Sequence, residues 1–194
     1  MKKIYILTII AFSLTCLIGC NNNKTLSESI EKIKLTGDLV TYQAYYHNVL
    51  EYDKEAGDGL FNLFEKDRRL FAEYTGTIKY GIDLSKVKIG VKGSTINVVI
   101  PKAKVIGEAN IDSEDFKPEN FIESKDGWIN PNPITADDIS IAFNQAQEEM
   151  KSAAEKDEKT LSMAQKRARI VIEENIKQFI DLSENDYKIE WKYE

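Results

Sequence analysis

The side chains that most often serve as nucleophiles, bases or metal ligands are scarce in this chain. Among its 194 residues there is one histidine, His47, and there are two cysteines, Cys16 and Cys20. A Ser-His-Asp or Cys-His arrangement would have to use His47, which falls beside Asn48 on the more polar positions of a strand-like segment. Zinc sites usually need two or more His or Cys ligands. We therefore interpret His47 as a surface or strand-end residue and expect no catalytic residues, no metal and no cofactor.

Cys20 has a more specific chemical context. The basic start Met1-Lys2-Lys3 is followed by Ile4–Ile18, a run of 15 residues that are all apolar or small and uncharged. A membrane-spanning helix needs about 20 such residues, whereas the apolar part of a secretory signal has about 7–15. The next residues, Leu17-Ile18-Gly19-Cys20, resemble the bacterial lipobox. In that motif the cysteine thiol receives a diacylglyceryl group, and a peptidase cleaves just before the cysteine.

The lipobox resemblance predicts a signal peptide at residues 1–19, lipid attachment at Cys20 and a polar tether at residues 20–25. An uncleaved transmembrane helix is the alternative, and the short apolar run and the polar Asn21-Asn22-Asn23 argue against it. Two acyl chains give stable anchoring, whereas one chain holds a protein only marginally. We expect a lipoprotein with acyl chains such as palmitate, anchored on the extracytoplasmic face of the cell membrane.

The charge balance of the chain limits its partners. The whole chain has 26 basic and 32 acidic side chains, and residues 1–19 contain two lysines and no acids, so the mature chain has 24 basic and 32 acidic groups and a net charge of −8. Nucleic-acid binding rests on neutralisation of phosphates by Lys and Arg, so no nucleic-acid partner is expected. With Cys16 removed and Cys20 acylated, the mature domain contains no disulfide.

Two acidic clusters and a set of tyrosines are weaker candidates for binding. The acidic clusters are Asp53, Glu55 and Asp58 in a glycine-containing loop, and Asp112, Glu114 and Asp115. Neither has the alternating oxygens, central glycine and distal glutamate of a calcium loop, so we interpret both as solvated turns. The tyrosines lie on two candidate neighbouring strands. Cross-strand aromatic pairs stabilise a sheet, and exposed aromatic rings could also stack on a sugar. The residues are Tyr42, Tyr45, Tyr46, Tyr74 and Tyr80. We favour the structural interpretation.

Alternating apolar residues predict four strands before residue 101. Long strands are expected at Leu39–Tyr52 and at Arg69–Leu84, where Gly76 and Gly81 indicate a bulge or bend. The apolar face of the first is expected to consist of Val40, Tyr42, Ala44, Tyr46 and Leu50. A hairpin with a turn at Lys92-Gly93 follows, and Pro101 ends it. Residues 109–133 hold three of the four prolines and are expected to be mostly irregular.

The residue pattern in the last third of the chain predicts a helical region followed by a strand. Thr135 and Asp138 have the spacing of a capping box, and apolar residues then recur at spacings of three and four up to Phe179. A single helix of about 45 residues would be roughly 68 Å long, so Ala136–Asp181 is either one helix with a kink or two helices that meet near Asp157–Thr160. Lys166, Arg167 and Arg169 are expected on its solvated face. A terminal strand, Tyr187–Tyr193, follows.

Two shorter segments complete the expected domain. Leu26, Ile30 and Ile33 have helical spacing, so a short amphipathic helix is expected across Thr25–Lys34. Asp83 follows a glycine, and its carboxylate is expected to tie a turn together by accepting backbone N–H groups. The fold class is therefore α+β: an antiparallel sheet, then a long C-terminal helix and a terminal strand, in one domain over residues 26–194.

Several segments together resemble the DUF4230 proteins, a family named for a domain of unknown function. They are Leu39–Tyr42 with Tyr45–Val49, Tyr74–Ser85, Ile96–Ala103 and the alanine-spaced helix Ala164–Ile180. The resemblance covers roughly residues 26–194, and Gly81-Ile82-Asp83-Leu84-Ser85 is its most specific part. It implies no catalytic residues. Members of the family are often tethered to a membrane at the N-terminus, which agrees with the lipobox.

Three functions are compatible with these features. The first is a non-enzymatic lipoprotein that binds or scaffolds another component of the cell envelope, with an envelope protein contacting the C-terminal helix. The second is a carboxylate-based hydrolase of cell-wall glycans, because two acids suffice for that reaction, although no pair stands out. The third is a small-ligand carrier with a pocket between sheet and helix. The first is the function that we expect.

Overall fold

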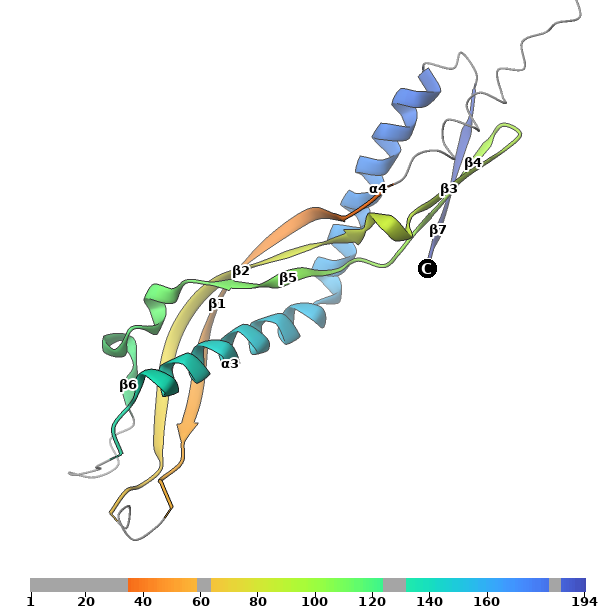
Figure 1. Ribbon diagram of the computed structural model, residues 1–194. Coiled ribbons are helices and arrows are strands. Elements are labelled where there is room, and N and C mark those ends of the chain that lie inside the picture. Colours follow the sequence, from red (N-terminus) through yellow and green to blue (C-terminus); the bar gives the residue numbers. More distant parts are fainter. Residues whose placement is uncertain (1–34, 59–63, 124–131, 182–185) are drawn as a thin grey trace, which may run out of the picture.

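The computed structural model describes residues 35–58, 64–123, 132–181 and 186–194 as an elongated molecule (Figure 1). The predicted signal peptide, the lipid attachment at Cys20, the tether and the helix at residues 25–34 lie outside the described residues. Two sheets follow one another along the length of the molecule. Helix α3 (Ala136–Glu155) packs on the first sheet, and α4 (Glu158–Asp181) packs on the first sheet with its beginning and on the second sheet with its later turns. The α+β class predicted from the sequence is confirmed.

The first sheet is built on the two long strands that the sequence predicted. Strand β1 (Asp38–Lys54) pairs antiparallel with β2 (Arg68–Asp83) along its whole length. Strand β5 (Lys104–Ile111) pairs with the second half of β2, and the two-residue strand β6 (Ile122–Glu123) pairs with its first half. Six apolar residues of β2 are all buried: Leu70, Ala72, Tyr74, Ile78, Tyr80 and Ile82.

Strand β5 was missed in the sequence, and its last three residues lie within residues 109–133, which were expected to be mostly irregular. Its alternation is broken by Gly107, whose φ of +75° most residues avoid, and its register with β2 shifts between Thr77 and Lys79. The rest of that region contains the 3-10 helices η3 (Ser113–Phe116) and η4 (Pro118–Asn120). A bulged strand has no regular period of two, so periodicity does not reveal it.

A bulge in β1 corrects a second expectation. The register with β2 shifts between Val40 and Tyr42, so Val40 turns outward and is 43% exposed, whereas Leu39 packs inward. Gly81 lies opposite the bulge, and a Cβ atom on it would lie 1.9 Å from the carbonyl oxygen of Leu39. The glycine therefore permits the close approach of the two strands, in agreement with the predicted bulge at this position.

The second sheet combines the predicted hairpin with the C-terminal strand. Strands β3 (Lys88–Lys92) and β4 (Thr95–Ile100) are antiparallel, with Gly93 at a φ of +59° in their turn, and the 3-10 helix η2 (Leu84–Lys86) connects β2 to β3. The terminal strand β7 (Lys188–Tyr193) pairs with β4 in parallel. A parallel partner needs a long crossover, and the last helix provides it.

The C-terminal helical region consists of two helices that break where the sequence predicted. Helix α3 (Ala136–Glu155) begins with the predicted capping box, and helix α4 (Glu158–Asp181) begins after Asp157, which accepts hydrogen bonds from the backbone N–H and the hydroxyl of Thr160. Helix α3 packs on the β1–β2–β5 sheet, and α4 extends to the β3–β4–β7 sheet (Figure 1). None of the helices that the structure describes is long and apolar enough to span a bilayer.

Candidate functional site

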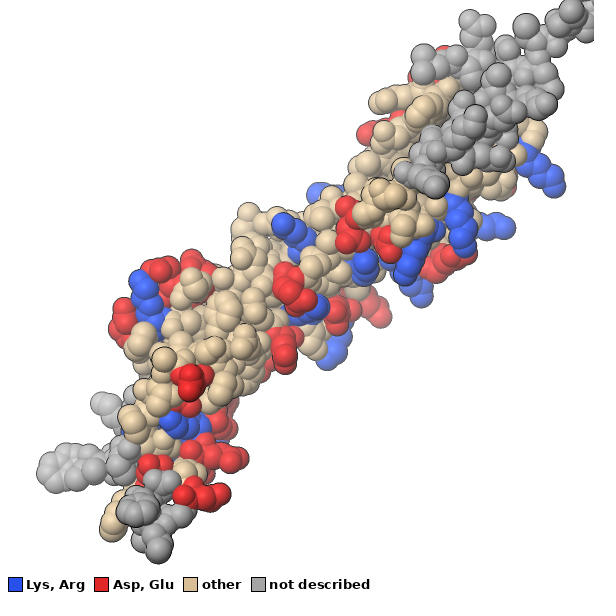
Figure 2. All heavy atoms as spheres, viewed as in Figure 1, with Lys and Arg blue, Asp and Glu red and all other residues tan. Residues whose placement is uncertain are grey.

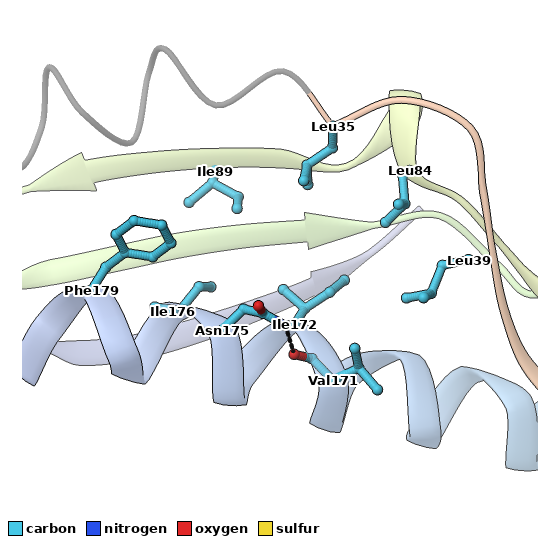
Figure 3. A pocket seen from close by; sticks show the side chains of 9 residues that line it. All are labelled: Leu35, Leu39, Leu84, Ile89, Val171, Ile172, Asn175, Ile176 and Phe179. Atoms are coloured by element: carbon cyan, nitrogen blue, oxygen red, sulfur yellow. Dashed lines mark hydrogen bonds between the residues drawn. The ribbon is translucent and has the colours of Figure 1, made fainter.

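An apolar cavity of the described residues lies between helix α4 and the start of the second sheet (Figure 3). Its volume is about 310 Å³. We call it the α4 groove and define it by the nine residues that line it: Leu35, Leu39, Leu84, Ile89, Val171, Ile172, Asn175, Ile176 and Phe179. These residues come from α4, from η2 and β3, and from the beginning of the described chain.

Helix α4 forms one wall of the groove because its apolar residues occupy two adjacent rows. Ile172 and Ile176 are each 5% exposed and belong to the core of the second sheet, with Ile96 and Ile100. Val171 and Phe179 belong to the neighbouring row, at helical spacings, and are 36% and 41% exposed. The helix thus buries one row completely and leaves the other at the rim of the groove.

The opposite wall depends on the β1 bulge. The bulge turns Leu39 toward α4, and Leu39 lines the groove together with Leu84 of η2 and Ile89 of β3 (Figure 3). Leu35, the first described residue, completes this wall. Residues that are separated by more than a hundred positions in the sequence are therefore brought together by the strand irregularity.

The groove offers little to a polar ligand. None of its nine lining residues is charged, and its one polar side chain is Asn175. The Asn175 Nδ2 atom donates to the carbonyl oxygen of Val171 at 2.7 Å, so part of its hydrogen-bonding capacity is used within the helix (Figure 3). Such a lining binds hydrocarbon and supplies no acid, base or metal ligand.

A second, more open depression of about 640 Å³ lies on the outer face of the first sheet. Tyr45, which is 82% exposed, and His47 project into it beside Thr75 and Thr77. The Nε2 atom of His47 lies 2.6 Å from Oε1 of the exposed Glu73. The structure thus places His47 on the surface, as the sequence predicted, in contact with Glu73 of the neighbouring strand.

The acidic clusters have structural partners. Asp53 accepts hydrogen bonds from Arg69 of the adjacent strand, and Asp112 caps η3 by accepting from the backbone N–H of Glu114. Asp115 accepts from both the backbone N–H and the hydroxyl of Thr75. Within the described ranges no group of three or more His, Cys, Asp or Glu side chains has the geometry to hold a metal ion.

Among the described carboxylates, Asp138 has the most strongly shifted pKa, and its residue is 8% exposed. Its Oδ2 atom accepts hydrogen bonds from Thr135 and from the Lys54 ammonium, and its Oδ1 atom accepts one from the Tyr52 hydroxyl at 3.3 Å. Burial alone would raise its pKa, but the hydrogen bonds from Lys54 and Thr135 and the charge of Lys54 outweigh burial and lower the pKa to about 2. The cluster caps α3 and fastens it to β1. The sequence predicted the capping box but not Lys54.

Four of the five tyrosines point into the core and the fifth does not. Tyr74 and Tyr80 are buried, Tyr42 packs edge-on against Tyr80, and the hydroxyl groups of Tyr46 and Tyr80 are hydrogen-bonded to each other. Burial and the Tyr46 hydroxyl raise the pKa of Tyr80, so it stays protonated. These contacts support the structural interpretation of the tyrosines.

Two of the three cations expected on a solvated helix face make additional contacts. The guanidinium carbon of Arg167 lies 4.9 Å from the centre of the Tyr42 ring, and that of Arg169 lies 5.1 Å from the centre of a Trp191 ring. Lys166 is exposed. The solvated-face prediction is therefore incomplete, because both arginines cover aromatic rings through cation–π contacts. In the view of Figure 2, basic and acidic side chains are both scattered along the described part of the molecule.

Asp83 has the role that the sequence predicted. Its Oδ1 atom accepts hydrogen bonds from the backbone N–H of Ser85 at 3.0 Å and from the Ser85 hydroxyl, and it thereby caps η2. These hydrogen bonds lower the pKa of Asp83. Because η2 carries Leu84, this turn positions one residue of the α4 groove.

Sequence reasoning missed the groove as a set of residues, although it considered a pocket between sheet and helix. Val171 and Phe179 were assigned to the apolar stripe of the helix. The width of that stripe was a signal that could have revealed the groove. Residues 171, 175 and 179 form one row and residues 172, 176 and 180 form the row beside it, whereas a single row would be enough to cover the sheet.

A family model described as "Protein of unknown function (DUF4230)" matches residues 31–185, which include every described residue of the groove and exclude β7. No curated protein and no solved structure matches the chain.

Proposed function

The chain belongs to the DUF4230 family of proteins of unknown function, and on that basis we propose that it is a lipid-anchored, non-enzymatic binding module of the cell envelope. Its signal peptide covers residues 1–19, its acylated residue is Cys20, and residues 20–25 are a tether before a single domain at residues 26–194. The binding site of the module is the α4 groove.

The single observation that carries this proposal is the composition of the α4 groove. Eight of its nine lining residues are apolar, and two of them, Ile172 and Ile176, are almost fully buried. Its volume of about 310 Å³ is at the lower end of the range for ligand pockets, about 300–1,000 Å³. A cavity with these properties favours binding over chemistry, because general acid–base catalysis needs titratable groups within reach of the substrate.

The position of the groove supports a role near the membrane. Leu35 lies in its wall, so the 15 residues from Cys20 to Leu35 can separate it from the lipid by at most about 50 Å. Strand β1 then runs away from α4 along the first sheet for a contour length of about 55 Å (Figure 1). The anchor would therefore hold the groove close to the membrane and project the β1–β2 hairpin outward.

The alternative hydrolase needs two carboxyl groups about 5–10 Å apart in a cleft, one of them buried. Asp138 is the buried carboxylate of the described residues, and its low pKa makes it a poor general acid. Its oxygens already accept hydrogen bonds from Thr135, Lys54 and Tyr52. No specific observation favours this alternative.

Metabolic labelling with radioactive palmitate tests the anchor. The wild-type chain, Cys20→Ala and Cys16→Ala are expressed in a bacterium that processes lipoproteins, and the cells are fractionated. We expect label in the membrane fraction for wild type and Cys16→Ala and none for Cys20→Ala, whose product keeps its leader. Equal labelling of the two variants, or an unlabelled wild-type chain that starts elsewhere, would refute the anchor at Cys20.

A further inference from the structure

We propose that the α4 groove holds one acyl chain of a membrane phospholipid. This inference deepens the proposed function, since it names the ligand of the binding module and rests on the groove being its site. Three properties of the groove lead to it: its size, its lack of charge and its distance from the proposed anchor.

The size of the groove suits a single hydrocarbon chain. Along α4 it runs from Val171 to Phe179, which corresponds to about 12 Å at 1.5 Å per residue. Its volume of about 310 Å³ is at the lower end of the range for ligand pockets, about 300–1,000 Å³. The groove therefore has room for a slender, extended ligand that lies along the helix.

The chemistry of the lining also selects hydrocarbon. A peptide strand would bring backbone N–H and C=O groups into the groove, and leaving such groups without partners costs free energy. The one polar lining side chain, Asn175, already donates to the Val171 carbonyl. An acyl chain has no such groups and gains about 0.8 kcal/mol for each methylene that it buries.

The rim of the groove is suited to a ligand that leaves its head group outside. Val171 and Phe179 remain 36% and 41% exposed at the edge, and Ile172 and Ile176 form the floor. A chain could enter between the exposed rim residues while its polar head stayed in solvent. The membrane is the source of such chains that lies nearest to the proposed anchor at Cys20.

A matched pair of substitutions on α4 tests the inference. Ile170 and Val171 are neighbours in sequence and both are partly exposed, at 53% and 36%, but only Val171 lines the groove. The mature chain carrying Cys20→Ala is mixed with phosphatidylglycerol vesicles that contain a pyrene-labelled phosphatidylglycerol. Transfer of the labelled lipid to the protein replaces excimer emission by monomer emission.

We expect saturable transfer to the parent chain. Val171→Asp should weaken it by about tenfold or more, because an acyl chain would have to bury the new carboxylate. Ile170→Asp should stay within about twofold of the parent. Phe179→Ser serves as a second groove variant with the same expected loss, and circular dichroism verifies that each variant is folded.

Four results would overturn the inference. They are no transfer to the parent chain, equal transfer to the two aspartate variants, uptake of free pyrenedecanoic acid without uptake of phospholipid, and a dimer that Val171→Asp dissociates. Because the assay uses a chain that lacks Cys20, its outcome is independent of the palmitate labelling. Failure of the anchor and failure of the groove are thus distinguished.

Discussion

The ammonium group of Lys54 lies 2.6 Å from Oδ2 of Asp138 and joins the end of strand β1 to the first turn of helix α3. The same ammonium donates to the Pro133 carbonyl at 2.7 Å. Both side chains are largely buried, at 17% and 11% exposure. The pair therefore fixes where α3 begins on the first sheet, and α3 in turn determines where α4 starts.

Removal of the Asp138 carboxylate should destabilise the domain. Asp138→Ala leaves Lys54 without its anionic partner in a mostly buried site and removes half of the capping box, so we expect a loss of about 3 kcal/mol in the free energy of unfolding. Urea denaturation followed by circular dichroism measures it. Glu148→Ala, an exposed substitution on the same helix, should change the stability by less than about 0.5 kcal/mol. Similar losses for both variants would contradict the role of the pair.

The low pKa of Asp138 predicts that the domain loses stability in acid. A group whose folded-state pKa lies below its unfolded value stabilises the fold above the unfolded pKa, and this contribution is lost as the pH falls through the folded value. For Asp138 the window runs from its ordinary pKa near 3.8 down to about 2 and involves about 2 kcal/mol. Asp138→Asn should flatten the dependence of stability on pH in that window. An unchanged slope would assign the acid sensitivity to other carboxylates.

The close approach of β1 and β2 at the bulge should depend on Gly81. Gly81→Ala would place a methyl group 1.9 Å from the Leu39 carbonyl oxygen, so we expect a loss of about 3 kcal/mol or a failure to fold. Gly90→Ala is the matched control, because Gly90 also lies in a strand and has no atom within 4 Å of the added methyl. It should be neutral within about 0.5 kcal/mol. Thermal melting of both variants distinguishes the two sites, and equal melting temperatures would be inconsistent with the bulge.

Asn175 should not be required for ligand binding. Its amide donates to its own helix, so Asn175→Leu removes no contact that an acyl chain could use and adds apolar surface to the groove. We expect lipid transfer within about twofold of the parent or stronger, with a stability gain of up to about 0.5 kcal/mol from helix propensity. The pyrene assay and urea denaturation measure the two quantities. A large loss of transfer would show that the groove recognises a polar group through Asn175.

Local patterns were sufficient for most of the elements. Alternation along most of their length identified β1, β2, β3, β4 and β7, and the capping-box spacing of Thr135 and Asp138 located the start of α3 within the chain. The position of the interruption between α3 and α4 also followed from the sequence, because the charged interval around Asp157 interrupts the apolar stripe, but the sequence left open whether one kinked helix or two helices would form there. In each case the physical cause lies within a few residues, so it can be read from the order of side chains.

The sequence by itself determined the amphipathic faces and the helix caps, since these depend on neighbours in the chain. Its composition also determined a negative net charge, which is unfavourable for nucleic-acid binding. The tertiary structure alone decided that β7 lies parallel to β4, that Lys54 reaches Asp138, and that Leu39 rather than Val40 faces α4. The α4 groove belongs to this second group, because residues 35–39 and 171–179 meet only after a bulge has changed the direction of one strand. A bulge reverses which side chains face the core, and it interrupts the alternation by which a strand is recognised in the sequence. Contacts between residues more than a hundred positions apart depend on tertiary packing, which no local pattern encodes.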